Sequence, residues 1–286
     1  MKNARYKRFA ALALTAALAV LAASCGETAG SRNSFEAKGS DTMVNLSQMW
    51  AEEYMKENPQ ISIAVTGGGS GTGISAMING TTDIANSSRE MKEEEKAEAE
   101  AKGVEVVENL VALDGLAVIV HPGNSVTELS IDELAGLFTG RISDWQEVGG
   151  EPGPIVLLSR ESNSGTHVFF KEHVLNEEEF APRTLLLPSS QQIIDELVNN
   201  PRAIGYVGLG YVSDGVRTLE VKEDEASPGI EPNVASVQDG SYPISRPLFV
   251  YSKQDSPQVV LDFLEWIMGP QGQKVVEELE FVPLNQ

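Results

Sequence analysis

One stretch of the chain, ISIAVTGGGSGTGI at residues 61–74, decides how we expect it to fold. Ile61, Ile63 and Val65 alternate with small or polar residues, a period typical of a β-strand, and the loop Gly67–Gly73 follows directly. Ile74 then starts a short helix that ends near Asn79. A strand that passes through small residues into a helix is the building unit of α/β proteins with largely parallel sheets.

A second stretch, IVLLSRESNSGTHVFF at residues 155–170, repeats this order of strand, small polar loop and helix. Both loops offer backbone N–H groups at a helix N-terminus together with hydroxyls, and the second adds the guanidinium of Arg160. Such donors bind anions. Small residues before a helix are also ordinary capping residues, so either loop alone indicates little. Two of them in one chain indicate two halves of one anion site.

The rest of the chain continues the alternation. A third small-polar loop, Gly39–Thr42, precedes a helix whose apolar face carries Met43, Leu46, Trp50 and Tyr54. We further expect strands at 83–86, 104–107, 110–120, around 204–207 and at 242–250, and helices at 90–102, 130–138, 191–199 and 257–268. In open α/β sheets ligands bind at the carboxyl ends of strands, where these loops fall. A cleft between two lobes would bring the loops together.

The N-terminus has the composition of a bacterial export signal. Four basic residues and an uncharged apolar stretch, Phe9–Ala23, precede Cys25, which is the only cysteine of the chain. Leu21–Cys25 resembles a lipobox, so we expect residues 1–24 to be a lipoprotein signal peptide, Cys25 to be acylated and residues 25–34 to form a tether. The alternative is an ordinary signal peptide followed by a chance cysteine. The protein is thus expected to be exported and lipid-anchored to the membrane.

Composition excludes several function classes. The formal charge of −21 argues against nucleic acid or anionic membrane surfaces as partners. No lysine follows the glycine loop at the Walker A spacing, and no serine sits in a Gly-x-Ser-x-Gly elbow. A loose dinucleotide pattern at residues 71–76 is weak by itself. His121, His167 and His173 lack a metal-ligand spacing. We therefore expect no cofactor, no metal and no catalysis.

Taken together, the motifs resemble those of the phosphate-binding proteins of Pst-type ABC transporters, within the periplasmic solute-binding superfamily. The resemblance covers essentially the whole mature chain and rests on six segments: residues 39–42, 69–73, 83–89, 138–145, 160–166 and 203–208. It implies a two-lobed type II periplasmic-binding-protein fold, with a mostly parallel sheet flanked by helices in each lobe and a hinge between the lobes. Lobe 1 would comprise residues 35–118 and 246–286 and lobe 2 residues 119–245, joined near 116–121 and 242–246.

The same resemblance implies a monomer that binds inorganic phosphate and delivers it to a membrane permease. The residues that it assigns to the anion, with Asp114 added because an acid inside an apolar strand needs a partner, are Ser40, Asp41, Thr42, Ser70, Gly71, Thr72, Ser88, Asp114, Arg160, Ser164, Gly165 and Thr166.

The identity of the group that accepts the phosphate proton stays open. Ser88 stands where some members of this family carry an aspartate acceptor, so either Asp114 or Asp41 could take that role. Alternatively, Asp114 pairs with Arg89 or caps a loop, and Arg160 forms a surface ion pair with a neighbouring glutamate. The alternative functions are binding of another oxyanion, such as sulfate or molybdate, and an exported phosphatase.

Overall fold

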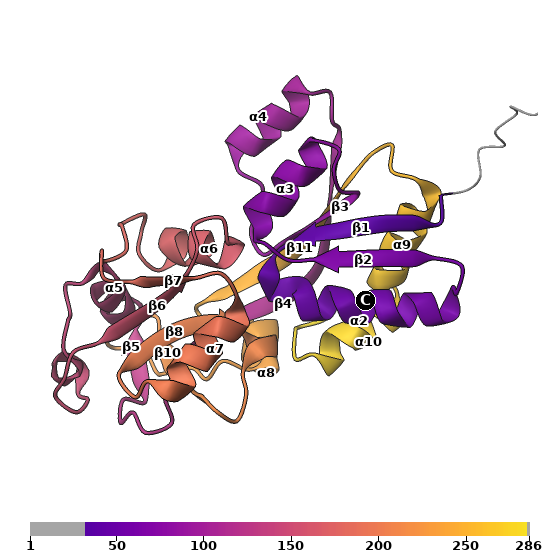
Figure 1. The fold of residues 1–286 in the computed structure, drawn as a ribbon. Helices are drawn as coiled ribbons and strands as arrows, with labels where there is room; N and C mark the ends of the chain where they lie inside the picture. The colour runs from indigo at the N-terminus through magenta and orange to yellow at the C-terminus, as the bar shows by residue number, and fades with distance from the viewer. Residues whose placement is uncertain (1–31, 285–286) are drawn as a thin grey trace, which may run out of the picture. The chain divides into compact units, whose positions relative to one another are not determined.

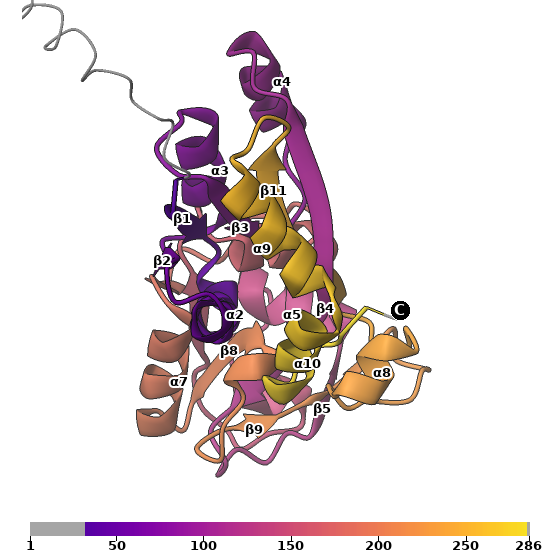
Figure 2. The ribbon, with the colours of Figure 1, turned by 90° about the vertical axis from the view of Figure 1, so that its right-hand side faces the viewer.

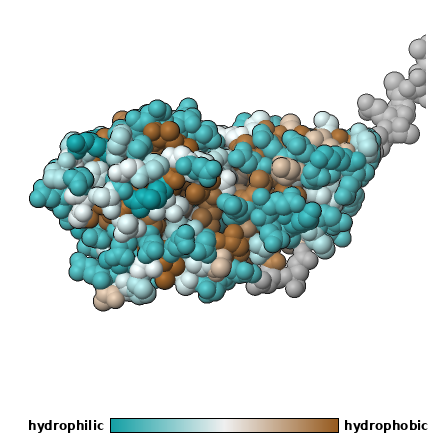
Figure 3. Space-filling model, turned by 90° about the horizontal axis from the view of Figure 1, so that it is seen from below, coloured by the Kyte–Doolittle hydropathy of each residue, from teal (hydrophilic) through white to brown (hydrophobic). Residues whose placement is uncertain are grey.

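The computed structural model describes residues 32–284, and residues from Asn33 onward form one compact unit. The expected signal peptide, Cys25 and most of the tether lie outside the described residues. Within that range no helix combines the length and apolarity needed to cross a membrane. Figure 3 shows that hydrophilic residues cover most of the face it draws, with hydrophobic residues in patches between them.

A first group of elements, which we call lobe 1, is built by residues 33–114 and 246–284 (Figure 1). Its strands β2, β1 and β3 are parallel, and β11 is antiparallel to β3. The strands are β1 (Ser34–Gly39), β2 (Ser62–Thr66), β3 (Ile84–Ser87) and β11 (Ser245–Lys253). The helices are η1 (Asp41–Met43), α2 (Val44–Glu57), α3 (Ser70–Ile78), α4 (Glu93–Ala101), α9 (Gln258–Met268) and α10 (Pro270–Glu278).

A second group, lobe 2, comprises residues 116–244. Its strands β7, β6 and β8 are parallel. The strands are β5 (Glu128–Ser130), β6 (Val156–Arg160), β7 (Leu185–Leu187), β8 (Ala203–Gly208), β9 (Arg217–Thr218) and β10 (Glu220–Lys222). The helices are α5 (Ile131–Thr139), η2 (Trp145–Val148), α6 (Gly165–His173), α7 (Ser190–Asn199), η3 (Leu209–Tyr211) and α8 (Val234–Gln238).

The strand β4 (Val106–Val120) passes through both lobes (Figure 2). Its first part pairs with β11 and its second part with β8 and β9, all antiparallel. The sheet is therefore continuous, with the order β2-β1-β3-β11-β4-β8-β6-β7. The chain crosses between the lobes at Gly115 and Ser245, which are paired neighbours on β4 and β11.

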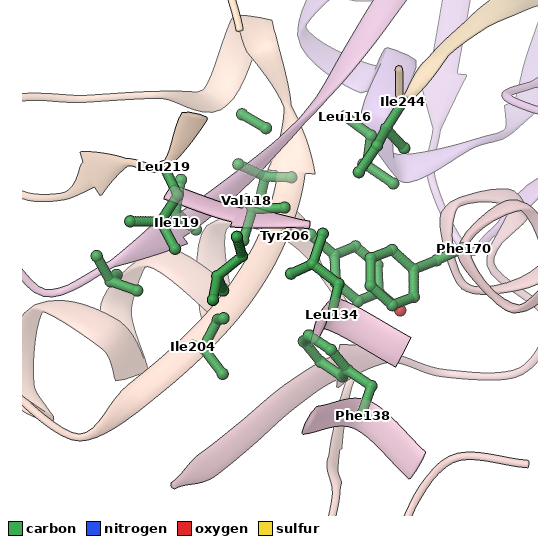
Figure 4. Packing of buried hydrophobic residues seen from close by; sticks show 14 of the residues in the cluster. Leu116, Val118, Ile119, Leu134, Phe138, Phe170, Ile204, Tyr206, Leu219 and Ile244 are labelled. Atoms are coloured by element: carbon green, nitrogen blue, oxygen red, sulfur yellow. The ribbon is translucent and has the colours of Figure 1, made fainter. Parts of the chain in front are cut away.

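The buried hydrophobic side chains form separate clusters in the two lobes, except that Val282 of lobe 1 packs in the cluster of lobe 2. The core of lobe 1 gathers Phe35, Trp50 and Phe263, among others, under α2 and α9. In lobe 2, Phe170 stacks on Tyr206 with the ring centroids 3.9 Å apart, beside Phe138 (Figure 4). Separate cores allow each lobe to move as a unit about the two crossing strands.

The structure corrects several expectations from the sequence. The predicted strands 104–107 and 110–120 are one strand, β4, because Glu108 and Asn109 between them pair with Tyr251 and Val250 of β11. Helix α3 begins at Ser70 rather than at Ile74, and α10 was not predicted. The core of lobe 2 already includes Leu116, before the expected boundary at residue 118.

Candidate functional site

Five hydroxyl side chains from both lobes are buried together, and we call them the hydroxyl cluster: Ser40, Thr42, Ser70, Ser88 and Thr166. None is more than 2% exposed. In lobe 1, Ser40 Oγ donates to Ser88 Oγ at 3.0 Å, and Ser70 Oγ lies 3.4 Å from Ser88 Oγ. Ser70 Oγ also accepts the backbone N–H of Ser88 at 3.1 Å. Three separate loops of lobe 1 thus converge on one point.

Lobe 2 meets this point through Thr166 and Gly165. Thr166 Oγ1 lies 2.7 Å from Thr42 Oγ1 across the boundary between the lobes. A Cβ atom on Gly165 would lie 2.4 Å from Ser70 Oγ and 2.7 Å from Ser88 Oγ. Only glycine permits this approach, because those distances are well below van der Waals contact.

Helix N-termini point donors at the same place. Ser70 is the first residue of α3 and Gly165 the first residue of α6, while Ser40 caps the short helix that leads into α2. The hydroxyl of Ser164 caps α6 by accepting the N–H of Thr166 at 3.2 Å. The first N–H groups of a helix lack intrahelical partners and carry partial positive charge, so they stabilise an anion without adding net charge.

Arg160 faces Asp41, the residue between Ser40 and Thr42, and its guanidinium has several hydrogen-bond partners. It is 1% exposed, and its guanidinium donates to Leu187 O, Pro188 O and Ser190 Oγ. Its Nη1 lies 3.2 Å from the carboxylate of Asp41 in the other lobe. Burial lowers the pKa of Arg160, and the charge of Asp41 opposes that shift. The alternative of a surface ion pair with a neighbouring glutamate is wrong.

Asp41 has a defined partner set of its own. The same oxygen that faces Arg160 accepts the N–H of Ser190 at 2.7 Å, at the start of α7. The backbone oxygen of Asp41 accepts from Tyr211 Oη at 2.9 Å. All three partners belong to lobe 2, so Asp41 bridges the lobes.

A buried hydrogen-bond network lies next to Arg160 in the sequence and joins Ser159, Tyr206 and His167. Ser159 Oγ lies 2.5 Å from Tyr206 Oη and 3.2 Å from His167 Nδ1. His167 also stacks on Phe180, and burial lowers its pKa. These contacts give His167 the structural role that its spacing predicted. Within residues 32–284 no group of three or more His, Cys, Asp or Glu side chains could hold a metal ion.

Asp114 is fully buried where the strands cross between the lobes. Its Oδ2 accepts from Nε and Nη2 of Arg246 at 3.0 and 2.8 Å, and its Oδ1 accepts the N–H of Leu209 at 3.1 Å. Burial raises the pKa of Asp114, and Arg246 and Leu209 N–H pull it down. The alternative pairing of Asp114 with Arg89 is wrong, because Arg89 binds both carboxylate oxygens of Glu95.

Gly71 and Thr72, which were assigned to the anion, contact lobe 2 instead. The N–H of Gly71 donates to Asn163 O at 3.1 Å, and Thr72 Oγ1 accepts from Asn163 Nδ2 at 3.2 Å. Sequence reasoning missed this role of Asn163, although Asn163 lies inside the second small-polar loop. It also missed Ser190 and Tyr211, whose partner Asp41 is far away in the sequence.

The fold and this cluster define a binding protein whose two lobes enclose a small anion. The family model of the PBP superfamily domain matches residues 26–271. Phosphate-binding protein PstS from Pseudomonas aeruginosa is 32% identical over 276 residues, which cover 90% of this chain and 85% of that protein. Its namesake from Bacillus subtilis is 33% identical and covers 95% of this chain and 92% of that protein.

Solved structures agree with these relatives. A phosphate ABC transporter substrate-binding protein from Clostridium perfringens with bound phosphate superposes with a TM-score of 0.82 at 30% identity, covering 88% of this chain and 100% of that chain. A phosphate transport receptor from Vibrio cholerae has a TM-score of 0.69 at 26% identity, with 87% and 100% covered. The chain belongs to the PBP superfamily and, within it, to the Pst-type phosphate-binding proteins.

Proposed function

We propose that this protein binds inorganic phosphate between its lobes, outside the cytoplasm, and delivers it to the permease of a phosphate ABC transporter. The observation that carries the proposal is the convergence of buried hydroxyls and helix N-termini from both lobes on Gly165. A tetrahedral anion needs many donors at once, and this arrangement supplies them in a water-free place. The names of the relatives support phosphate as that anion.

We assign direct contact with phosphate to the hydroxyl cluster, to Ser164 and to the N–H groups of Ser70 and Gly165, the first residues of α3 and α6. Arg160 supplies a full positive charge to the site, and it is held in place by Asp41, the residue between Ser40 and Thr42. Asp114 is removed from the set, because Arg246 and Leu209 already use its acceptor oxygens.

The phosphate proton then has a hydroxyl oxygen as its acceptor. Ser88 is 0% exposed and bonded to Ser40 and Ser70, and a hydroxyl oxygen can accept as well as donate. A carboxylate repels sulfate, whereas a hydroxyl can turn and donate to it. We therefore expect this site to discriminate less sharply between phosphate and sulfate than a site with a carboxylate acceptor.

Two further parts of the proposal concern the oligomeric state of the protein and its attachment to the membrane. We propose that the protein acts as a monomer and that acylated Cys25 anchors it to the membrane, with about 0.8 kcal/mol for each buried methylene of the lipid. Fractionation tests the anchor: the parent should sediment with membranes and Cys25→Ala should not. Retention of Cys25→Ala in the membrane fraction would contradict the anchor.

Calorimetric titration with phosphate, arsenate, sulfate and molybdate tests the ligand. We expect phosphate to bind most tightly and Ser70→Ala to weaken it, since a buried hydrogen-bond donor to a charged group contributes about 1.5–3 kcal/mol. Tighter binding of sulfate or molybdate would make the protein a carrier of that ion. Incubation with phosphomonoesters tests the phosphatase alternative, which requires turnover that Ser70→Ala or Ser164→Ala abolishes.

A further inference from the structure

The glycine loop of lobe 1 has two sides with different contacts. Ser70 turns toward the buried cluster, whereas Gly68, Gly71 and Thr72 contact the loop of lobe 2 that carries Asn163. Asn163 itself is exposed, so it lies at the rim of the site and not among the buried hydroxyls. The rim contact is therefore distinct from the groups that we assign to the anion.

Asn163 makes this contact with both its side chain and its backbone. Nδ2 donates to Gly68 O at 2.9 Å and to Thr72 Oγ1 at 3.2 Å. The backbone oxygen accepts the N–H of Gly71 at 3.1 Å. Three hydrogen bonds from one residue thus join the two lobes at the start of α3.

The backbone of lobe 1 is shaped to receive Asn163. Gly69 has φ of +92°, and a Cβ atom there would lie 2.6 Å from Asn163 O. Glycine at this position satisfies both the left-handed conformation and the close approach. A second polar bridge between the lobes, from Asp41 to Ser190 and Arg160, involves the cation of the site and so cannot be separated from anion binding.

We propose that Asn163 is a positioning residue that latches lobe 2 onto the glycine loop after the anion is enclosed, and that it thereby sets how long phosphate is held. This inference rests on the proposed function. The hydrogen bonds of Asn163 to the loop form only when the lobes meet, and water replaces them when the lobes part. Removing these hydrogen bonds destabilises the closed form alone, so the rate of phosphate dissociation rises and the rate of association stays unchanged.

Stopped-flow kinetics on the full chain tests the latch with Asn163→Ala and with Asn199→Ala as the matched control. Asn199 makes its side-chain hydrogen bond within α7, to Asp195 O. Asn163→Ala removes the two side-chain hydrogen bonds and keeps the backbone one. We expect it to raise the phosphate dissociation rate about tenfold, at roughly threefold for each bond lost, with an unchanged association rate. Thr72→Val should raise the dissociation rate less, and its effect should largely disappear in the Asn163→Ala background, because both changes remove the same contact.

Thermal unfolding separates a latch from a general structural role. Without phosphate, Asn163→Ala should melt at the temperature of the parent, and only the stabilisation by saturating phosphate should shrink. An unchanged dissociation rate, or an equal loss of melting temperature with and without phosphate, would overturn the latch.

A failure of the proposed function would look different. If the parent binds no phosphate, that function fails, and X-ray scattering then tests the latch by itself. In the presence of whichever of arsenate, sulfate and molybdate binds, the parent should match the scattering calculated for the present arrangement of the lobes, and Asn163→Ala should have a larger radius of gyration at the same concentration of that ion. Identical scattering curves would refute the latch in that case as well.

Discussion

Replacement of Gly165 by alanine tests the geometry of the site most directly. The added methyl would lie 2.4 Å from Ser70 Oγ and 2.7 Å from Ser88 Oγ, about 1 Å closer than ordinary contact, and 3.1 Å from Ser70 Cβ. The overlap exists only where the lobes meet, so the cost of turning the two hydroxyls or of holding the lobes apart falls on the closed form. Overpacking of this kind costs about 1–3 kcal/mol, which weakens phosphate binding roughly five- to 150-fold.

The free energy of unfolding of the phosphate-free protein should increase slightly in Gly165→Ala or stay unchanged. Gly165 is the first residue of α6, where alanine stabilises the fold by about 0.4–1 kcal/mol because it reduces the conformational entropy of the unfolded chain. The assay is calorimetric titration with phosphate, alongside thermal unfolding without it. Gly269→Ala is the matched control, because its Cβ would meet neighbours at 3.4 Å or more, in lobe 1 between α9 and α10. Parent-like phosphate affinity in Gly165→Ala would refute the placement of the anion at the start of α6.

Two further predictions concern the buried ionisable groups. Asp114→Asn leaves Arg246 as an uncompensated buried charge, so we expect denaturant titration to show a loss of about 3–5 kcal/mol in the free energy of unfolding. The preference for phosphate over sulfate should stay unchanged, and a gain of sulfate binding would restore Asp114 as the selectivity element. In the folded protein the pKa of His167 lies below its ordinary value of about 6.5, so folding favours the neutral imidazole. The contribution of His167 to the free energy of unfolding is therefore fully present above pH 6.5, and it is lost as the pH falls through the folded pKa. The variant His167→Asn keeps the other charged groups around this position, Arg160, Lys171 and Glu179. Comparing the melting temperatures of parent and variant between pH 5 and 8 therefore isolates the titration of His167. Equal pH slopes below pH 6.5 would contradict the lowered pKa of His167.

The sequence by itself determined the α/β alternation, the loops that open the helices and most of the donors. Strand period and helix caps depend on residues only a few positions apart, so they can be read locally. The loops that carry Ser70, Gly165 and Thr166 were predicted because capping residues and glycine are typical of helix N-termini, and the family resemblance assigned these three residues to the anion. The family resemblance followed from the order of these same local motifs.

Only the tertiary structure decided which polar groups pair. Asp114 and Arg246 are 132 residues apart, and Asn163 and Gly68 are 95 apart, so no local pattern could join them. A buried charge must find a partner, but the sequence does not say which one, and here Arg246 and Arg160 take the two aspartates that were candidates for the phosphate proton. The glycine loop shows the same limit. Its composition predicted donors, but only the tertiary structure decided that Ser70 joins the hydroxyl cluster and that Gly71 binds Asn163.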